Sequence, residues 1–490
     1  MDKHMEVLTD KYNKQGSQDV YQEVRRAILP MKRGNARRGK GPGYNEPLMG
    51  HVVGITEPQW TTETKLRRIA WLSGMDVHKE YDSLMHHINE TSLKECFYQL
   101  SGDKAVGVDG VTKAEYEESL DENLEDLISR MKQMSYRPGP VRQVLIPREG
   151  KPNATRPLGI SNFEDKLVQK MMQRILESIY DPIFLDCSYG FRPGRGCHDA
   201  IGDLHQYLYK NEVQTVIDVD LAGYFDSIDH QHLQAFLGKK IKDQVFMRYV
   251  TRMLKAGVLT EGELGVSEEG VPQGNICSPI LANVFAHYVI DEWFQDTVKK
   301  HCRGKVEMFR YADDIVICCQ YERDAKRILT ALTKRPGKYG LKLNEEKTCL
   351  VTFSKRGYDQ GIKQEAFDFL GFTFYIGRSR KGFPLPKVKS SGKRLRGKLK
   401  RVSEWSQKAT RRYRLGEVWR RFRVKLLGHI RYYGVTFNGR HVGKFVHASI
   451  RILYRWLCRR SQRKTLSWVK FLQFIKANPL PKVRVYHKLY

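Results

Sequence analysis

Two acidic motifs interrupt apolar runs that have the composition of β-strands. The first places Asp218 and Asp220 at alternate positions of the run 216–221, and the second places Asp313 and Asp314 between two apolar halves, the pattern of a β-hairpin. Carboxylates buried in strands are costly unless a cation pairs with them. If the hairpin lies beside the first strand, Asp220 and Asp313 face one another with Cβ atoms about 5 Å apart. The two motifs therefore predict a cation site.

Oxygen ligands of this kind favour a hard cation such as Mg²⁺ over zinc. Two carboxylates on neighbouring strands can hold two Mg²⁺ ions about 3.5 to 4 Å apart, an arrangement that activates an attacking 3′-oxygen and stabilises a leaving pyrophosphate. The alternative is that these acids only cap turns or helices. Asp218 shares a strand face with Asp220 and is the competitor for the metal role. Asp226 and Asp229 are interpreted as turn or N-cap residues, because a helical pattern follows them.

An α+β domain with an antiparallel sheet is predicted to position these acids. Strand and helix patterns are mixed along the chain, and no internal repeat is present. The glycine-rich segment 105–110 is predicted to be a tight loop. The expected strands are 141–147, 215–221, 308–318, 348–353 and 367–374. The expected helices are 166–180, 198–209, 230–239, 281–298 and 322–337.

The charge of the 490-residue chain is strongly asymmetric. The formal net charge is +30, and 33 lysines and arginines but only two acids follow residue 375, so the preceding part is close to neutral. A basic domain of this kind favours a polyanionic partner, and nucleic acid is the first candidate because phosphate contacts release counterions. A solvated basic face or a membrane-surface patch is the alternative.

Cysteine usage and hydropathy predict where the protein resides. The nine cysteines form no C-x-x-C pair, which indicates a reducing compartment and argues against a disulfide framework or a cysteine-type zinc site. No run of about 18 apolar residues is present, and the first residues do not resemble a secretory signal. We therefore expect a cytoplasmic protein without a membrane partner.

Two basic helices are predicted in the C-terminal part, each with an apolar stripe and a cationic stripe. The predicted buried residues are Trp419, Phe422, Leu426 and Ile430 on one helix and Ile450, Leu453, Tyr454 and Leu457 on the other. The predicted phosphate-binding residues, for structured RNA, are Arg420, Arg421, Arg423, Lys425, Arg451, Arg455 and Arg459. Like charges four residues apart destabilise a helix unless a polyanion neutralises them. Tyr432 and Tyr433 are expected to pack rather than to stack on bases.

The box Tyr311-Ala312-Asp313-Asp314 resembles the catalytic box of reverse transcriptases. The chain from about residue 60 onward resembles the reverse transcriptase/maturase proteins encoded by group II introns. The matching motifs occur in the order and spacing of the family, so their combination is more specific than any one of them. They are 107–112, 146–148, 156–160, 188–195, 270–274, 278–279, 341–348, 369–372 and, in the maturase-specific part, 428–434.

The resemblance implies a role for each residue of the predicted cation site. The metal ligands would be the carboxylates of Asp220, Asp313 and Asp314 and the backbone carbonyl of Leu221. Phe225 falls at the position where a bulky ring excludes a 2′-hydroxyl and so selects deoxynucleotides. The alternative is that Phe225 is an ordinary core residue.

The resemblance also implies a nucleotide-binding set. Arg156 matches a residue that holds the incoming triphosphate, to which a guanidinium fork is well suited, and Arg148 would assist it. Gln273 matches a residue that contacts the nucleotide and the primer terminus. Lys347 resembles a lysine that donates a proton to pyrophosphate or neutralises it. The alternative is that Lys347 is only a solvated lysine.

A right-hand polymerase is the fold that the resemblance implies. The expected parts are a leader at 1–60, fingers and palm at 61–375, a thumb and maturase-specific (X) domain at 376–460, and a basic tail at 461–490. The expected function is RNA-directed DNA synthesis with two Mg²⁺ ions, together with maturase binding of the group II intron RNA for splicing and retrohoming. The expected partners are intron RNA, RNA template with DNA primer, target DNA and dNTPs in the bacterial cytosol or nucleoid, with the oligomeric state left open.

Two rival functions follow from the same residues, namely a domesticated reverse transcriptase for defence or repair and a non-enzymatic splicing cofactor. The clustered acids argue against the latter, because binding alone does not require them. Ala222 stands where relatives commonly carry lysine, and 275–277 replace a more usual glycine-containing stretch. Cys458 and His487 are too few to hold the zinc of an endonuclease domain. We therefore expect an endonuclease-lacking type that does not cut the second target strand and primes from a pre-existing 3′ end.

Overall fold

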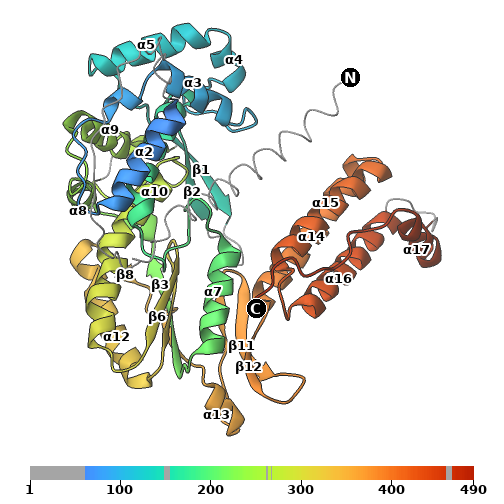
Figure 1. The fold of residues 1–490 in the computed structure, drawn as a ribbon. Helices are drawn as coiled ribbons and strands as arrows, with labels where there is room; N and C mark the ends of the chain where they lie inside the picture. The colour runs from blue at the N-terminus through green and yellow to red at the C-terminus, as the bar shows by residue number, and fades with distance from the viewer. Residues whose placement is uncertain (1–60, 148–154, 261–262, 266–267, 460–465, 490) are drawn as a thin grey trace, which may run out of the picture.

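The computed structural model describes residues 61–147, 155–260, 263–265, 268–459 and 466–489. Helices and strands are mixed in an elongated body, and a helical arm lies beside it (Figure 1), so the predicted α+β class is confirmed. The predicted leader 1–60, Arg148 and part of the predicted tail 461–490 lie outside the described residues. In the part that the structure describes, no helix has the length and apolarity needed to cross a membrane.

One end of the body, here called the distal lobe, consists of helices around a four-stranded sheet of order β2-β1-β4-β5. The strands are β1 (Val141–Pro147), β2 (Thr155–Ile160), β4 (Val258–Thr260) and β5 (Glu263–Gly265). The surrounding helices are α2 (Thr62–Met75), α3 (Glu90–Gln99), α4 (Lys113–Glu117), α5 (Leu120–Lys132) and α9 (Gln244–Leu254). In α5, Leu124, Leu127 and Met131 are buried, because their spacing places them on one face.

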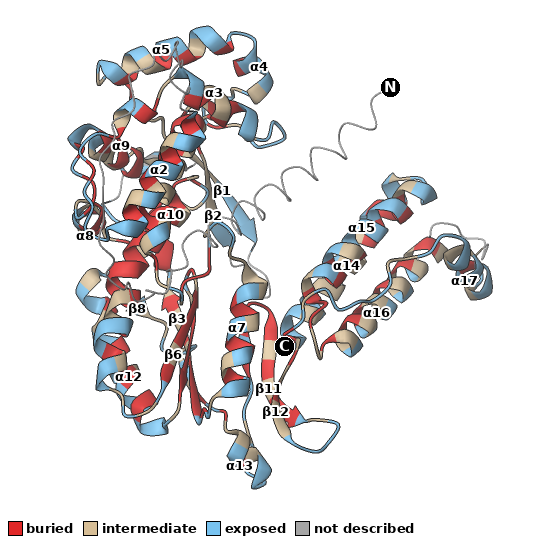
Figure 2. Cartoon of the chain, in the orientation of Figure 1, coloured by how far each residue is buried: buried red, intermediate tan, exposed pale blue. Residues whose placement is uncertain are grey.

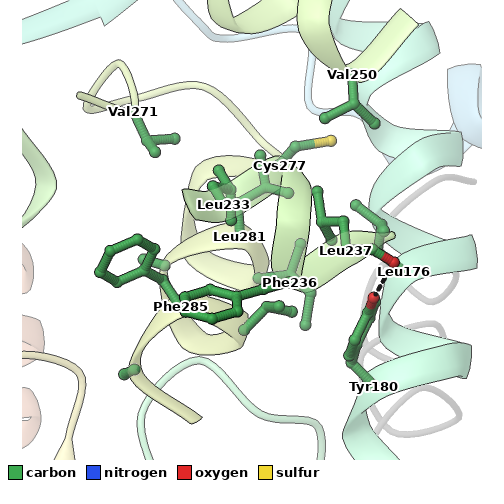
Figure 3. Close-up of a cluster of buried hydrophobic side chains, with 14 of the residues drawn as sticks. Leu176, Tyr180, Leu233, Phe236, Leu237, Val250, Val271, Cys277, Leu281 and Phe285 are labelled. Atoms are coloured by element: carbon green, nitrogen blue, oxygen red, sulfur yellow. Dashed lines mark hydrogen bonds between the residues drawn. The ribbon is translucent and has the colours of Figure 1, made fainter. Parts of the chain in front are cut away.

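A long helix, α6 (Phe163–Tyr180), joins the distal lobe to the middle of the body. Its side chains Leu176 and Tyr180 contribute to an apolar cluster with residues of α8 (His230–Leu237) and α10 (Ser278–Ala286), as Figure 3 shows. The Tyr180 hydroxyl donates a hydrogen bond of 3.1 Å to the carbonyl of Leu237. Because this tyrosine oxygen is satisfied, its ring can be fully buried without the cost of an unpaired polar group.

The central sheet has the order β6-β7-β3-β8, with β9 also paired to β3, and every pairing in it is antiparallel. Its strands are β3 (Thr215–Ala222), β6 (Val306–Tyr311), β7 (Asp314–Cys319), β8 (Lys342–Leu343) and β9 (Cys349–Thr352). Ile217 and Val219 join the apolar cluster that includes α10, whereas Val216 and Val316 join a second cluster with α7 (Cys197–Lys210). Both faces of the sheet are therefore covered (Figure 2), which explains its nearly continuous apolar runs.

The helix predicted over 281–298 is not a single α-helix. It begins as α10 and continues as two π-helical stretches, His287–Asp291 and Phe294–Val298. The predicted helix over 322–337 is found as α12 (Glu322–Lys334), after the hairpin β6–β7 and separate in sequence from the π-helical stretches. Among the described residues, π-helical turns occur in these two stretches, and such turns are frequently found at functional sites.

A small antiparallel sheet connects the body to the arm. It consists of β10 (Phe367–Phe369), β11 (Phe372–Arg378) and β12 (Pro384–Ser390). The domain boundary predicted after residue 375 falls inside β11, and β12 lies where basic helices were expected. Prolines are tolerated in β12 because it is an edge strand, and Pro386, Val388 and Ser390 are buried at alternate positions.

The arm comprises α14 (Gly392–Arg412), α15 (Leu415–Tyr433), α16 (Gly439–Cys458) and α17 (Trp468–Ala477). The two predicted apolar stripes are confirmed as core, since their eight residues are buried or packed against buried residues. Tyr433 is buried, and the Tyr432 hydroxyl donates to the Leu370 carbonyl at 2.8 Å, so the expectation that both tyrosines pack is also confirmed. The arm is thereby fastened to the small sheet.

Candidate active site and nucleic-acid interface

The two acidic motifs meet where β3 ends beside the β6–β7 hairpin. Asp220 pairs in register with Asp314 across β3 and β7, and Tyr311 pairs with Asp314 across the hairpin. The prediction that Asp313 lies opposite Asp220 is wrong, because the two-residue turn places Asp313 beyond the last paired position. Ala312 has a left-handed φ of 58°, which turns the chain sharply enough to close this hairpin.

The acidic side chains repel one another, as their pKa values indicate. Burial and the neighbouring charge of Asp313 raise the pKa of Asp314 to about 6, against a bond from the Leu370 backbone N–H that lowers it. Burial also raises the pKa of Asp313, and the charge of Asp220 adds to this effect. Asp218, the predicted competitor, reaches a pKa of about 7 through burial and through Asp314, Asp220 and Asp368. A cation bound among these carboxylates would therefore reduce their mutual repulsion.

Asp218 provides a test of this repulsion through protein stability. Folding raises the pKa of the Asp218 carboxyl to about 7. Such a group stabilises the fold at pH values below its pKa in the unfolded chain, and this contribution is lost as the pH rises through about 7. We expect Asp218→Asn to gain stability over the original chain, by on the order of 2 kcal/mol, as pH increases from 4 to 8. Urea unfolding at several pH values, with a chelator present, measures this difference. A difference that stays constant over this range would contradict the expected repulsion.

Lys347 supplies the cation nearest to Asp220. Its Nζ lies 2.5 Å from Asp220 Oδ2, in the turn that leads from β8 into β9. Both side chains are partly exposed, so this ion pair is weak and a competing cation can replace it. The chain thus brings the predicted Lys347 directly to the predicted metal carboxylate.

No three His, Cys, Asp or Glu side chains in the described part of the chain converge closely enough to hold a metal ion by themselves. This arrangement still fits Mg²⁺, which is usually held by one or two carboxylates together with water and substrate phosphates. Leu221, whose carbonyl is the further predicted ligand, lies at the end of β3 opposite Leu343 of β8. The acids of β3 and the hairpin are the donors available at this position.

Two of the predicted nucleotide-binding residues, Arg156 and Gln273, form a hydrogen-bonded chain with Asp226 beside the acids. Arg156 of β2 donates from Nε to Gln273 Oε1, and Gln273 donates from Nε2 to Asp226 Oδ1 at 3.0 Å. The positive charge of Arg156 also lowers the pKa of Asp313, which places the guanidinium near the hairpin turn. Asp229 is the N-cap of α8 and Asp226 lies in the short turn Tyr224–Ser227, as predicted, and Asp226 also accepts the hydrogen bond from Gln273.

Phe225 lies directly after β3 in a short 3₁₀ turn, Tyr224–Ser227. Its side chain is 8% exposed, and its ring meets that of Phe191 edge-on with centroids 6.3 Å apart. Phe191 is 47% exposed and also contacts the ring of Tyr311, at 6.4 Å. Phe225 and Phe191 therefore form a pair of contacting rings, one buried and one partly exposed, beside the hairpin that carries the acids; this pair is here called the phenylalanine wall.

Sequence reasoning gave no role to Phe191 or to Arg310. Arg310 is completely buried and forms an ion pair with Asp291, also completely buried. A charged residue inside an apolar strand requires a buried partner, so the run Phe309-Arg310-Tyr311 contained a usable signal for this pair. Nothing in the sequence identified Asp291 as that partner, because nineteen positions separate the two residues.

The predicted cationic residues of the arm lie on its surface. All seven are exposed, and they come from α15 and α16. Arg420 and Arg421 both pair with Glu417, so part of their charge is already used within α15. Arg451 and Arg455 share one face of α16, Arg459 follows at its C-cap, and all three side chains are exposed to solvent. This row of α16 is the stronger candidate for contact with phosphates.

Comparison with known proteins places these features in a family. Residues 146–374 match the family model described as reverse transcriptase (RNA-dependent DNA polymerase). Protein YkfC of Escherichia coli (strain K12) is 31% identical over 309 residues, 56% of this chain and 77% of YkfC. The group II intron-encoded protein LtrA of Lactococcus lactis subsp. cremoris is 34% identical over 223 residues. The chain belongs to the group II intron reverse transcriptase/maturase family.

The alignments of this reverse transcriptase/maturase family member cover only part of several relatives. The alignment with LtrA spans 45% of this chain and 37% of LtrA, so the chain matches little more than a third of that protein. The nuclear intron maturase 3, mitochondrial, of Arabidopsis thaliana is 34% identical over 135 residues, 18% of its length. The matched region 146–374 contains the acids of β3 and of the hairpin.

Proposed function

We propose that this chain is an RNA-directed DNA polymerase of a group II intron and that it also binds the intron RNA as a maturase. The observation that carries the proposal is that Asp220, near the end of β3, pairs in register with Asp314 at the start of β7, next to Asp313 in the hairpin turn and beside Lys347 and Arg156. Clustered carboxylates such as Asp313 and Asp314, whose pKa values are raised by burial and by neighbouring acids, are a costly arrangement for a protein that only binds RNA. They are useful where cations and phosphates must be held together.

In this proposal the molecule is a right-hand polymerase. The distal lobe is the fingers, the central sheet is the palm, and the arm is the thumb with the maturase-specific domain. The small sheet β10–β12 joins palm to thumb, so the change from body to arm occurs near residue 391 rather than at 375. Template and primer would lie between the fingers and the thumb, over the acids.

Asp220, Asp313, Asp314 and the Leu221 carbonyl would hold two Mg²⁺ ions, which when bound supply activation of the primer 3′-oxygen and stabilisation of the leaving pyrophosphate. Arg156 would bind the triphosphate with its guanidinium fork. Gln273, which is held between Arg156 and Asp226, would orient the nucleotide. Lys347, which pairs with Asp220, would neutralise pyrophosphate or donate a proton to it once it leaves that carboxylate.

Primer extension tests the proposal directly. The full chain, a DNA primer annealed to an RNA template, the four dNTPs and Mg²⁺ should give DNA that extends to the end of the template. RNA binding without any extension would favour the rival function, a non-enzymatic splicing cofactor. Extension on RNA templates without selective binding of any group II intron RNA would favour the other rival, a domesticated polymerase.

Phe225 is proposed to select the sugar of the incoming nucleotide. Replacing Phe225 by alanine should raise the ratio of ribonucleotide to deoxynucleotide incorporation about 10- to 100-fold, because the space for a 2′-hydroxyl opens. Single-nucleotide incorporation kinetics with GTP and dGTP measure this ratio. Phe236→Ala, which truncates a buried aromatic on α8, is the matched control and should leave the ratio unchanged. An unchanged ratio in Phe225→Ala would make Phe225 an ordinary core residue.

Intron binding is assigned to the arm. The exposed arginines of α16 and the basic residues of α14 and α15 follow one another along helices whose opposite faces are core. A rigid cationic surface of this kind suits the backbone of structured RNA, which is recognised by shape and phosphate position. Target DNA during retrohoming would use the same charge, because phosphate contacts are independent of sequence.

A further inference from the structure

Arg310 holds the active-site turn from behind. Its Nε and Nη2 donate to the two carboxylate oxygens of Asp291, its Nη2 also donates to Ser188 Oγ at 2.7 Å, and its Nη1 donates to the Ala312 carbonyl at 3.2 Å. The Ala312 carbonyl belongs to the peptide group that leads into Asp313. A fully buried arginine thus fixes the peptide plane from which the Asp313 carboxylate projects.

Asn283 extends this network to a second turn. Its Oδ1 accepts from Arg310 Nη1 at 3.1 Å, and its Nδ2 donates to the Gly190 carbonyl at 2.7 Å. The Gly190 carbonyl belongs to the peptide group that leads into Phe191. The buried side-chain amide of Asn283 therefore fixes the peptide plane between Gly190 and Phe191. Arg310 fixes the peptide plane between Ala312 and Asp313 in the same way.

The two turns also touch directly, and both are strained. Ala312 and Phe191 have φ values of 58° and 57°, a left-handed backbone conformation that residues other than glycine rarely adopt. A Cβ on Gly190 would lie 2.5 Å from the Ala312 backbone nitrogen, so only glycine lets the turns approach this closely. Strained turns persist where the surrounding structure over-determines them, and the contacts of Arg310 and Asn283 do so here.

The network sets the position of the Phe191 ring. Its ring is 47% exposed, yet it meets both the buried ring of Phe225 and the ring of Tyr311. This partly exposed ring lies on a strained turn that touches the hairpin turn of Asp313. It is placed to extend the phenylalanine wall toward an incoming nucleotide.

We propose that Arg310 and Asn283 are positioning residues that tie the placement of Asp313 to that of Phe191, and that Phe191, as the second ring of the phenylalanine wall, takes part in selecting the sugar. The proposal rests on the proposed polymerase function. It implies that the metal-binding side and the sugar-selecting side of the site are set by one buried network and respond together when it is disturbed.

Three variants separate the contributions of Asn283, Phe191 and Arg310. Asn283→Asp keeps an acceptor for Arg310 but loses the donor to Gly190 and faces that carbonyl with a carboxylate, so it should disturb Phe191 more than Asp313. Phe191→Ala removes an exposed ring and should leave folding intact. Arg310→Lys keeps the charge but loses the fork, so it should disturb both turns.

Single-nucleotide incorporation on an RNA template, with GTP or dGTP and a series of Mg²⁺ concentrations, gives the needed readouts. Phe191→Ala and Asn283→Asp should raise the GTP/dGTP ratio of kcat/KM about tenfold while the half-saturating Mg²⁺ concentration changes little. Arg310→Lys should also raise this ratio, and in addition lower kcat about 100-fold and raise the Mg²⁺ requirement. A purely structural role would change the melting temperature without moving either readout.

The control is Asp324→Asn, because Asp324 is also buried in the palm and accepts from the Arg303 and Gly304 backbone N–H groups, but it lies outside the network. It should leave the GTP/dGTP ratio and the Mg²⁺ requirement unchanged. If Phe191→Ala and Asn283→Asp keep the original ratio while Phe225→Ala raises it, the inference is overturned and the proposed function stands. If the original chain does not extend a primer at all, the proposed function itself fails.

Discussion

Replacing Asp313 by asparagine is expected to abolish primer extension on an RNA template, with a loss of about 1,000-fold or more, while binding of RNA is retained. The physical reason is that an amide cannot supply the anionic oxygen that a hard cation requires, although its size is nearly the same. Asp313 lies in the two-residue turn of the hairpin and takes no part in its strand pairing, so the substitution should not disturb the sheet. Rapid-quench extension and RNA filter binding on the same preparation measure the two quantities.

Asp296→Asn provides the control for this experiment. Asp296 is an exposed aspartate of the second π-helical stretch and has no part in the proposed site. Its substitution makes the same chemical change and should leave extension unaffected. Extension by Asp313→Asn at the original rate would remove the two-metal assignment, and a simultaneous loss of RNA binding would indicate misfolding instead.

The second large effect is expected from the arm. Replacing Arg451, Arg455 and Arg459 together by glutamine should weaken binding of structured RNA and reduce the slope of log affinity against log salt by about 2 to 3, since each lost phosphate contact removes somewhat less than one unit. Substitution is preferable to truncation, because Ile430 and Tyr433 of the arm share a buried cluster with Phe372 of the small sheet. Deleting the arm would expose that cluster.

A matched triple variant lies on the body. Arg323, Lys326 and Lys334 of α12 are exposed and basic, and their replacement by glutamine makes the same change in net charge. If the RNA lies on the arm, this variant should keep nearly the original slope. Equal slopes for both triple variants would show that overall charge, and not the surface of α16, governs the interaction.

Local patterns in the sequence predicted most of the elements and most of the site. Strand β1 was predicted with the same bounds, and β3, the hairpin and the stripes of the arm were found close to their predicted positions, because each depends on the spacing of neighbouring side chains. The ion pair between Lys347 and Asp220 brings two predicted residues together from positions 127 apart. The family motifs assigned each residue a role but did not predict their pairing, since neither motifs nor composition give information on such distant contacts.

The parts that sequence reasoning missed depend on tertiary contacts. Strand β12 contains two prolines and alternating lysines in a region where basic helices were predicted, and its edge position beside β11 is what makes it a strand. The register that sets Asp314 opposite Asp220 follows from the length of the hairpin turn, which the apolar pattern alone does not fix. The partners of Arg310 come from α10, a π-helical stretch and the segment before α7, and no local pattern connects them.

The hydrogen bond from Tyr432 to Leu370 has a consequence for protein engineering. The backbone N–H of Leu370 also lowers the pKa of Asp314, so a single residue in the turn between β10 and β11 links a tyrosine of the arm to a carboxylate of the palm. An arm exchanged between relatives at a junction in the α14 region would separate Tyr432 from the strand it evolved against. A chimera that transfers residues 367–489 as one module keeps this joint intact, and β10 is therefore the natural place to begin a graft.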